Sequence, residues 1–307
     1  MEIAVLGSLN MDLVTNVPTL PRIGETVAGS SFENTPGGKG ANQAVAAKRL
    51  GASVSMIGQV GDDIYGMELL NYLRAEGISV ENVSISHSTH TGVALIGVED
   101  SGLNSIIAVY GANMDESAAY EESIRQAVVG ADVLLLQNEI PYRYNVIAAE
   151  MARKNNSVVI WDPAPVRGDA VDLAHIATFI TPNEHEIVPF IDESEVIVDD
   201  IQSVFDISLR INETFSASPI ITLGEKGVVF VDEGVPLLQR ARSVVSVDSV
   251  AAGDAFSGAF AVGIGEDMTL PEAVRFACVA GSICVQRRGA QVSMPTREEV
   301  DSLLLGF

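Results

Sequence analysis

One short segment near the end of the chain combines a single carboxylate with small residues. Ala251, Ala252 and Gly253 come directly before Asp254, and a helical pattern rich in small residues follows. Small residues allow a tight turn, and the N–H groups and positive dipole end of a helix start attract an anion such as a phosphoryl group. Asp254 could accept the proton of an attacking hydroxyl. A base beside an anion site is the arrangement that phosphoryl transfer requires.

Two polar residues follow the first apolar stretch of the chain. Asn10 and Asp12 are two positions apart, so in an extended segment their side chains project to the same side. An amide and a carboxylate placed in this way can hydrogen-bond neighbouring hydroxyls of a polyol. Both residue types are also common in turns, so a turn without a ligand is an equally open interpretation.

A glycine-rich block occupies residues 36–43. Three glycines within four residues allow close approach of the backbone to a ligand, and a helix is predicted directly after them. The spacing is not that of a Walker A motif. Lys39 and Asn42 are therefore predicted to face a hydroxylated ligand. The alternative is a flexible loop with an exposed lysine.

Two further polar sites follow predicted strands. Glu139 closes the strand at 133–136, where a plain surface carboxylate is the alternative. Asn183 could cap a helix, and with Glu186 it could hold a water on a phosphate-bound Mg²⁺. His185 is predicted to be a surface residue, since no second His or Cys lies at ligand spacing.

Two glycine-containing segments complete the candidates. Residues 222–227 join two strand patterns, and this segment is either a simple hairpin or a turn that approaches a nucleotide. Residues 287–291 read as a helix end, because cations followed by glycine are a C-terminal signal.

The elements that must position these residues alternate along the chain. Short apolar runs predict buried strands at residues 3–6, 54–60, 133–136, 158–161, 179–181 and 220–223. Helical patterns predict helices at 40–50, 65–76, 116–129, 142–154, 197–213, 253–265 and 270–287. This alternation indicates a mostly parallel sheet covered on both faces, with ligands at the carboxyl ends of the strands.

Two segments, roughly 12–35 and 88–110, break the alternation and look like β material with turns. Their apolar residues need a partner or a ligand beneath them. We expect one α/β domain over residues 1–307, with three layers and an inserted small sheet that acts as a lid.

Composition limits the classes of partner. The chain has 307 residues, 47% hydrophobic residues and a formal net charge of −23. Such acidity argues against nucleic acid and anionic membranes as partners, whereas local N–H groups still permit a phosphorylated ligand.

The cysteines, the first residues and the apolar runs of the chain predict a cytoplasmic protein. Cys278 and Cys284 lie six apart in one helical run, about 9 Å along the axis, too far for a disulfide. Two buried free thiols suit a reducing compartment. The first residues read as a strand rather than a signal peptide, and no run of about 18 apolar residues predicts a membrane span.

Taken together, these motifs resemble the ribokinase/PfkB family of carbohydrate kinases nearly from end to end. The most specific parts are the Gly-Gly-Lys-Gly-Ala-Asn-Gln block at 37–43 and the Ala-Ala-Gly-Asp block at 251–254. The resemblance implies ATP-dependent phosphorylation of D-ribose at O5. The alternatives are a kinase for deoxyribose, another sugar or a nucleoside, and a sugar-binding protein without catalysis.

The resemblance also implies roles for individual residues. Asp254 would be the base, with an anion hole from the N–H groups of Ala252, Gly253 and their neighbours. The implied ribose site consists of Asn10, Asp12, Gly38, Lys39, Asn42 and Glu139. The implied ATP site consists of Asn183, Glu186, Thr222, Gly224, Glu225, Lys226, Gly227, Gly253 and Cys278. Cys278 departs from the family pattern, in which His or Asn often lies near the adenine.

Two further properties are implied in the same way. Family members often bind K⁺ beside the anion hole, and the implied ligands are Asp248, Val250, Cys284, Arg287, Gly289 and Ser293, mostly through backbone carbonyls. The lid would cover the sugar and pair two subunits into a homodimer.

Overall fold

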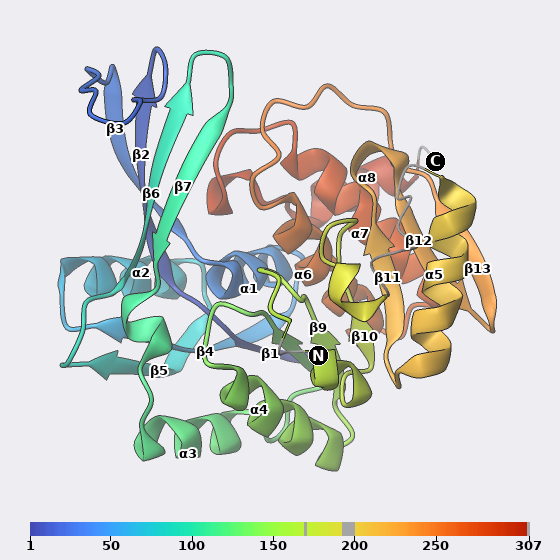
Figure 1. Ribbon diagram of the computed structural model, residues 1–307. Helices are drawn as coiled ribbons and strands as arrows, with labels where there is room; N and C mark the ends of the chain where they lie inside the picture. The colour runs from blue at the N-terminus through green and yellow to red at the C-terminus, as the bar shows by residue number, and fades with distance from the viewer. Residues whose placement is uncertain (169–170, 192–199, 306–307) are drawn as a thin grey trace.

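The middle layer of the molecule is a sheet of nine strands. They are β1 (Glu2–Leu6), β4 (Ser53–Gly61), β5 (Ser79–Ser86), β8 (Val133–Leu136), β9 (Val158–Trp161), β10 (Phe179–Ile180), β11 (Ser218–Thr222), β12 (Val228–Asp232) and β13 (Val235–Gln239). This computed structural model describes residues 1–168, 171–191 and 200–305. The strand order is β13-β12-β11-β10-β9-β8-β1-β4-β5 (Figure 1).

The sheet is parallel from β5 to β11, and β12 and β13 are added antiparallel at one edge. β1 lies inside the sheet, with β4 on one side and β8 on the other. The chain order reverses at this strand, and in such sheets the carboxyl ends at the reversal form a crevice for ligands. Residues that follow β1 and β8 are therefore placed at a natural binding position.

Helices cover both faces of the sheet, as Figure 1 shows. One face carries α1 (Lys39–Arg49), α2 (Ile64–Ala75), α6 (Ala252–Gly265), α7 (Leu270–Cys284) and α8 (Arg297–Leu304). The other carries α3 (Ala118–Ala127), α4 (Tyr142–Lys154) and α5 (Ile201–Thr214). Alternate strand residues enter the two cores: Val5 packs with the first group and Leu6 with the second. The predicted three-layer α/β fold is confirmed.

A second, smaller sheet stands away from the main body at the upper left of Figure 1. It consists of β2 (Asn10–Val17), β3 (Ser31–Gly37), β6 (Gly92–Glu99) and β7 (Asn104–Val109), in the order β3-β2-β6-β7. β2 and β6 run parallel, whereas the other neighbours are antiparallel. These strands come from the two segments that break the strand–helix alternation. Short 3₁₀ turns lie at η1 (Gly111–Met114), η2 (Val171–His175), η3 (Val188–Phe190), η5 (Gly224–Lys226) and η6 (Gln291–Ser293).

Some boundaries differ from those predicted. α7 ends at Cys284, three residues before the predicted end at 287, because the N–H groups of Gln286 and Arg287 bond to the carbonyls three residues back, those of Ile283 and Cys284, in a tighter 3₁₀-type turn. α5 starts at Ile201, and residues 197–199 of the predicted helix lie outside the described residues. β5, β13 and α8 were not predicted. No helix among the described residues combines the length and apolar character needed to cross a membrane.

Candidate active site

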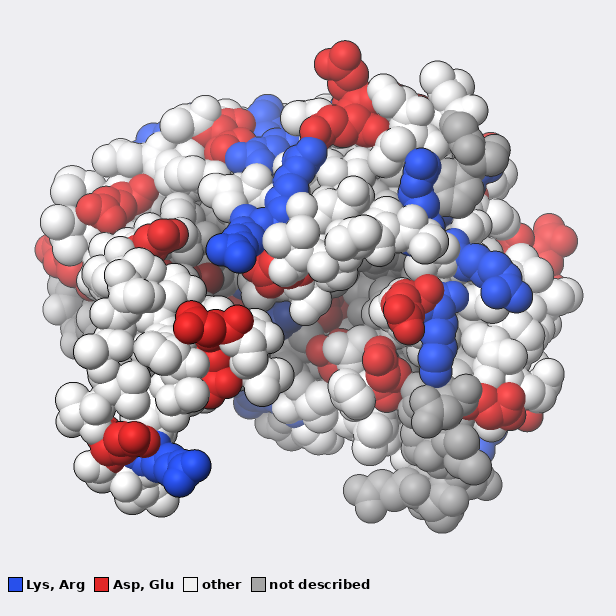
Figure 2. All heavy atoms as spheres, turned by 90° about the horizontal axis from the view of Figure 1, so that it is seen from above, with Lys and Arg blue, Asp and Glu red and all other residues white. Residues whose placement is uncertain are grey.

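A cavity of about 190 Å³ lies at the carboxyl ends of β9, β10 and β11, beside the start of α6. Its lining residues are Lys39, Asp162, Ala164, Thr181, Asn183, Glu186, Thr222, Ser249, Ala251, Ala252, Gly253 and Asp254. Side chains from five separate parts of the chain therefore meet here. The face seen in Figure 2 is hollowed near the middle of the molecule, with acidic side chains around the hollow.

The loop before α6 turns sharply into the helix at Ala251. This alanine has φ 59° and adopts the left-handed conformation at the N-cap, which costs about 1–3 kcal/mol and is found where a site requires it. The Ala252 N–H donates to the Ser249 carbonyl at 3.3 Å. The N–H groups of Gly253 and Asp254 belong to the first turn, where a helix offers no internal acceptor. A side chain added at Gly253 would meet no atom within 4 Å, so the space above the helix start is open.

The carboxylate of Asp254 is buried and held by α1. Asn42 donates from Nδ2 to Asp254 Oδ2 at 2.8 Å, and Gln43 donates from Nε2 to Asp254 Oδ1 at 3.2 Å. Only 4% of Asp254 is exposed. The Oδ1 atom of Asn42 is buried and has no hydrogen-bond partner among the described residues. Asn42 can therefore still accept a hydrogen bond, and a ligand hydroxyl is a suitable donor.

Lys39 begins α1 and faces several carboxylates. Burial alone would lower the pKa of Lys39, but the charges of Asp254, Asp162, Glu139 and Glu186 together raise it well above its ordinary value. Lys39 is therefore a permanent cation at the cavity wall. A lysine in this position is suited to hold an anion between itself and the start of α6.

Asp12 and Glu139 form an acidic pair near Lys39 and Asp254, and neither residue lines the cavity. Burial, followed by the charges of Glu139 and Asp254, raises the pKa of Asp12 to about 7. Glu139 accepts hydrogen bonds from the Ser8 hydroxyl and from the Lys39 N–H, the latter at 3.1 Å. The two carboxylates thus lie within electrostatic reach of the base candidate.

Asn10 and Gly38 meet at the point where the small sheet joins the main body. A Cβ at Gly38, which has φ 89°, would lie 2.7 Å from the Asn10 backbone nitrogen, so this glycine has no room for a side chain. The amide of Asn10 is 4% exposed. The predicted sugar residues, which are Asn10, Asp12, Gly38, Lys39, Asn42 and Glu139, therefore form one connected group with Asp254.

The predicted nucleotide residues divide into three groups. Asn183, Glu186 and Thr222 line the cavity, and Asn183 accepts the N–H groups of His185 and Glu186 in a turn instead of capping an α-helix. Residues 224–227 make the η5 turn between β11 and β12, where the side chains of Glu225 and Lys226 are exposed. Cys278 is buried in α7, which raises its pKa to about 12, and it does not line the cavity.

The segments predicted to hold a monovalent cation lie side by side beneath the loop before α6. Asp248 accepts the N–H groups of Val250 and Gly289, each at 3.0 Å. The Cys284 thiol lies 3.0 Å from the Ser293 hydroxyl, and burial raises its pKa to about 11, so it is a neutral group. Oxygen atoms from a carboxylate and backbone carbonyls fit a hard cation, whereas this thiol does not.

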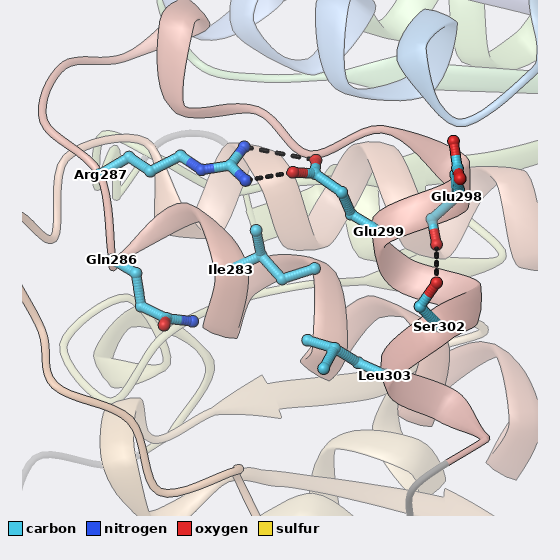
Figure 3. Close-up of a pocket in the computed structure, with 7 residues that line it drawn as sticks. All are labelled: Ile283, Gln286, Arg287, Glu298, Glu299, Ser302 and Leu303. Carbon is cyan, nitrogen blue, oxygen red and sulfur yellow. Dashed lines mark hydrogen bonds and ion pairs between the residues drawn. The ribbon is translucent and has the colours of Figure 1, made fainter.

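Arg287 points away from that segment, into a larger groove of about 460 Å³ between α7 and α8 (Figure 3). Its guanidinium pairs with the carboxylate of Glu299. Any contribution of Arg287 to a cation site would come from its backbone carbonyl. Throughout residues 1–168, 171–191 and 200–305, no three His, Cys, Asp or Glu side chains are grouped so that they could hold a metal ion.

Three residues with direct contacts to the site were not among the sequence candidates. Asp162 lines the cavity, Gln43 donates to both Asp162 and Asp254, and Asn113 donates to Asn10. Asp162 directly follows a predicted strand, a position that could have identified it. Gln43 is adjacent to Asn42 in the glycine-rich block, but its role depends on partners more than one hundred residues away.

The fold and the site together define a kinase that acts on a small hydroxylated substrate. The chain belongs to the pfkB family of carbohydrate kinases, whose model matches residues 1–297. It is 40% identical over 306 residues to a ribokinase of Bacillus subtilis, with 99% of each chain covered.

Two solved structures have the same fold. A ribokinase from Thermotoga maritima superposes with a TM-score of 0.86 at 35% identity, covering 99% of each chain. The ribokinase of Arabidopsis thaliana, complexed with ribose and ATP, gives a TM-score of 0.86 at 30% identity and 98% coverage of each chain. The predicted family and enzyme class are confirmed.

Proposed function

We propose that this protein transfers the γ-phosphoryl group of ATP to O5 of D-ribose, which yields ribose 5-phosphate. The observation that carries the proposal is Asp254, a buried carboxylate at the start of α6 whose two oxygens are held by amides of α1. It lies between a group of sugar-type polar residues and a cavity lined by Lys39 and the small-residue loop. The similarity to ribokinases over almost the whole chain supports ribose as the sugar.

The proposed mechanism uses Asp254 as the general base. Its carboxylate takes the proton of the attacking hydroxyl while the N–H groups of Gly253 and Asp254 and the Lys39 ammonium stabilise the charge on the transferred group. Asn42 offers Oδ1 as an acceptor, and Asp12 and Glu139 accept hydrogen bonds from other hydroxyls of the sugar. Mg²⁺ on the nucleotide phosphates would neutralise part of their charge, and Asn183 and Glu186 would hold its water ligands.

The small sheet is proposed to be a lid over the sugar within a single domain, and an interface for a homodimer. Its exposed apolar residues support this: Phe32 is 62% exposed, Ile106 53% and Ile107 61%. A sheet with such residues is stabilised by a partner surface. Sedimentation analysis should give a dimer, and Ile107→Lys should shift it to a monomer; a wild-type monomer at micromolar concentration would contradict the proposal.

We place the enzyme in the cytoplasm and assign it K⁺ as an activating ion. Both cysteines are buried and free, which agrees with a reducing compartment. Asp248 and the carbonyls around Gly289 are proposed to hold the cation beside the loop that ends at Asp254.

A coupled ADP-release assay tests the function. We expect turnover with ribose to exceed turnover with deoxyribose, fructose and common nucleosides. Asp254→Asn should lower kcat by roughly a hundredfold or more, since a general base contributes about 10²–10⁴. The matched control is Asp267→Asn, an exposed carboxylate just beyond the far end of the same helix with φ 59°, which asparagine tolerates. Preference for another substrate, or near-normal turnover of Asp254→Asn, would contradict the proposal.

A further inference from the structure

A relay of buried side-chain amides leads to the two carboxylates of the site. Gln137, just after β8, donates from Nε2 to Gln43 Oε1 at 2.7 Å. Gln43, near the start of α1, donates from its own Nε2 to Asp162 Oδ2 at 2.8 Å and to Asp254 Oδ1 at 3.2 Å. Both glutamines are completely buried. Two residues therefore connect the middle of the sheet to the base candidate.

The direction of this relay follows from the chemistry of its ends. As the proposed base, Asp254 is an ionised carboxylate that only accepts hydrogen bonds, so the Nε2 group of Gln43 must face it. Asp162, whose pKa is raised by burial, accepts the other hydrogen of the same group. The Oε1 atom of Gln43 then needs a donor, and Gln137 supplies its Nε2 group. The remaining Oε1 atom of Gln137 is buried and has no partner among the described residues.

That unpartnered oxygen lowers the stability of the protein, because a buried acceptor loses its hydrogen bonds to water. It is also tightly enclosed, since a Cβ at Gly7 would lie 1.9 Å from it. An apolar side chain of similar size at position 137 would leave no such atom there. The amide of Gln137 thus serves a purpose other than stability, and within the described part of the chain the side chain that it orients through its Nε2 group is Gln43.

The relay restricts Asp254 from one side while Asn42 restricts it from the other. Asn42 binds Oδ2 and Gln43 binds Oδ1, so rotation of the carboxylate would break a hydrogen bond in either direction. The Nε2 group of Gln43 lies between Asp254 and Asp162, two buried acidic groups, and bridges them by donating one hydrogen to each. A base held in one orientation loses less freedom on reaching the transition state.

We propose that Gln43 is a positioning residue for phosphoryl transfer, which holds the Asp254 carboxylate in the orientation that accepts the proton of the sugar hydroxyl, and that Gln137 fixes the amide of Gln43. This inference rests on the proposed role of Asp254 as the base. Gln43 touches neither substrate in this scheme. Its effect should therefore fall on kcat and leave the Michaelis constants for ribose and ATP nearly unchanged.

The test compares Gln43→Met, Gln43→Glu and Gln137→Met with the wild type, at saturating ribose and ATP. Methionine keeps the length of the side chain and removes the donor, so kcat should fall roughly tenfold to a hundredfold, as expected for loss of a hydrogen bond to a charged group. Both Michaelis constants should stay within about threefold. Gln43→Glu should be more impaired than Gln43→Met, because it adds a third carboxylate beside Asp162 and Asp254.

Gln137→Met provides a readout that a purely structural role would not give. The substitution removes the unpartnered Oε1 atom of Gln137, but it also deprives Gln43 Oε1 of its donor. Since the number of unpartnered acceptors stays the same, the melting temperature of the variant should stay close to that of the wild type while kcat falls severalfold. The matched control is Gln59→Met. Gln59 is also a buried amide, 4% exposed, but it donates to the Asp115 carbonyl, so kcat should be unchanged.

Three results would overturn the inference. They are a kcat of Gln43→Met within twofold of the wild type, an equal loss of kcat in Gln59→Met, and full activity of a stable Gln137→Met. The proposed function is tested separately by Asp254→Asn. If that variant is inactive while Gln43→Met is normal, the inference about Gln43 alone is wrong. If Asp254→Asn is active, both are wrong.

Discussion

Asn113 donates a hydrogen bond from Nδ2 to Oδ1 of Asn10, at 2.8 Å and across 103 residues of chain. Asn113 is 1% exposed, and its own Oδ1 accepts the N–H group of Leu9 at 2.9 Å. Its orientation is therefore fixed from both ends. Because Oδ1 of Asn10 is already bonded, the Nδ2 group of Asn10 is the part left for a ligand. Asn113 thus orients the Asn10 amide, and in the proposed sugar site Asn10 would act as a donor.

Replacing Asn113 by Asp tests this relationship. A carboxylate cannot donate to Asn10 Oδ1, so the Asn10 amide should lose its orientation or reverse it. We expect the Michaelis constant for ribose to rise about tenfold, with the Michaelis constant for ATP unchanged, in the coupled assay. In an Asn10→Ala background the same substitution should add almost nothing, since the two residues act through one contact. Additive effects of the two substitutions would show that Asn113 does not act through Asn10.

The raised pKa of Asp12 predicts pH dependence of sugar binding. Burial, Glu139 and Asp254 raise this pKa to about 7. Above that pH Asp12 is a carboxylate that accepts hydrogen bonds from hydroxyls, and below it the group is protonated. The Michaelis constant for ribose should therefore fall as the pH rises from about 6 to about 8. In Asp12→Asn this change of the Michaelis constant with pH should disappear. If the change persisted, a group other than Asp12 would be responsible for it.

The same shift has a consequence for stability, with a definite sign. The folded protein binds a proton on Asp12 between the unfolded pKa near 4 and the folded pKa near 7, so ionisation of Asp12 opposes folding. This destabilisation is fully present above about pH 7 and is lost as the pH falls toward 4. Asp12→Asn should raise the melting temperature more at about pH 8 than at about pH 5. An equal effect at both values would contradict the shift.

Close contact between α1 and α6 predicts a linked loss of stability and turnover. A Cβ at Gly258 would lie 2.7 Å from the Ala46 Cβ and 2.8 Å from the Gln43 carbonyl. Gly258→Ala should separate the helices that carry Asn42 and Asp254. We expect a loss of about 1–3 kcal/mol in the free energy of unfolding, as for an overpacked core, together with a lower kcat. Thermal melts and the coupled assay measure both.

A second glycine provides the control for that substitution. At Gly281, in α7, an added Cβ would meet its nearest neighbour, the Ala252 carbonyl, at an ordinary 3.6 Å. Gly281→Ala should keep or raise the melting temperature, because alanine favours a helix by up to about 1 kcal/mol. Equal destabilisation of both variants would contradict a specific role for Gly258.

The proposed cation site predicts a response to salt. K⁺ beside the loop before α6 would hold its N–H groups toward the phosphoryl group, so turnover should rise when Na⁺ is replaced by K⁺ at constant ionic strength. Asp248→Ala removes the acceptor for the Val250 and Gly289 N–H groups and should abolish this response. Equal turnover of the wild type in Na⁺ and in K⁺ would contradict the proposed cation site.

Much of the fold could be predicted from local patterns. The strands at 133–136 and 158–161 and the helix at 142–154 have the predicted ends, because each is an apolar or amphipathic run with clear boundaries. β5 lies at the edge of the sheet and pairs with β4 through a register shift. Its buried and exposed residues do not alternate regularly, so the sequence carries only a weak strand signal. α8 could have been found from its capping box, in which Thr296 and Glu299 bond each other's backbone.

The candidate site was predictable where a residue type and a local motif coincide, as at Lys39, Asn42 and Asp254. Asp162 had a local signal in its position after a strand, whereas Gln43 and Asn113 were missed for a common physical reason. Each acts through a side chain that is distant in sequence: Gln43 reaches Asp162 across 119 residues and Asp254 across 211. Local propensity contains no information on such contacts.

The interior position of β1 also has a consequence for how the chain is made. β1 is synthesised before both of its neighbours, β4 and β8, so both its edges are paired only after residue 136 has been synthesised. A nascent chain therefore keeps the β8 edge of this apolar strand unpaired long after β4 has been made, which makes it a target for chaperones. Asp254 and its amide partners meet later still, so a prematurely terminated chain would expose this strand without ever forming the site.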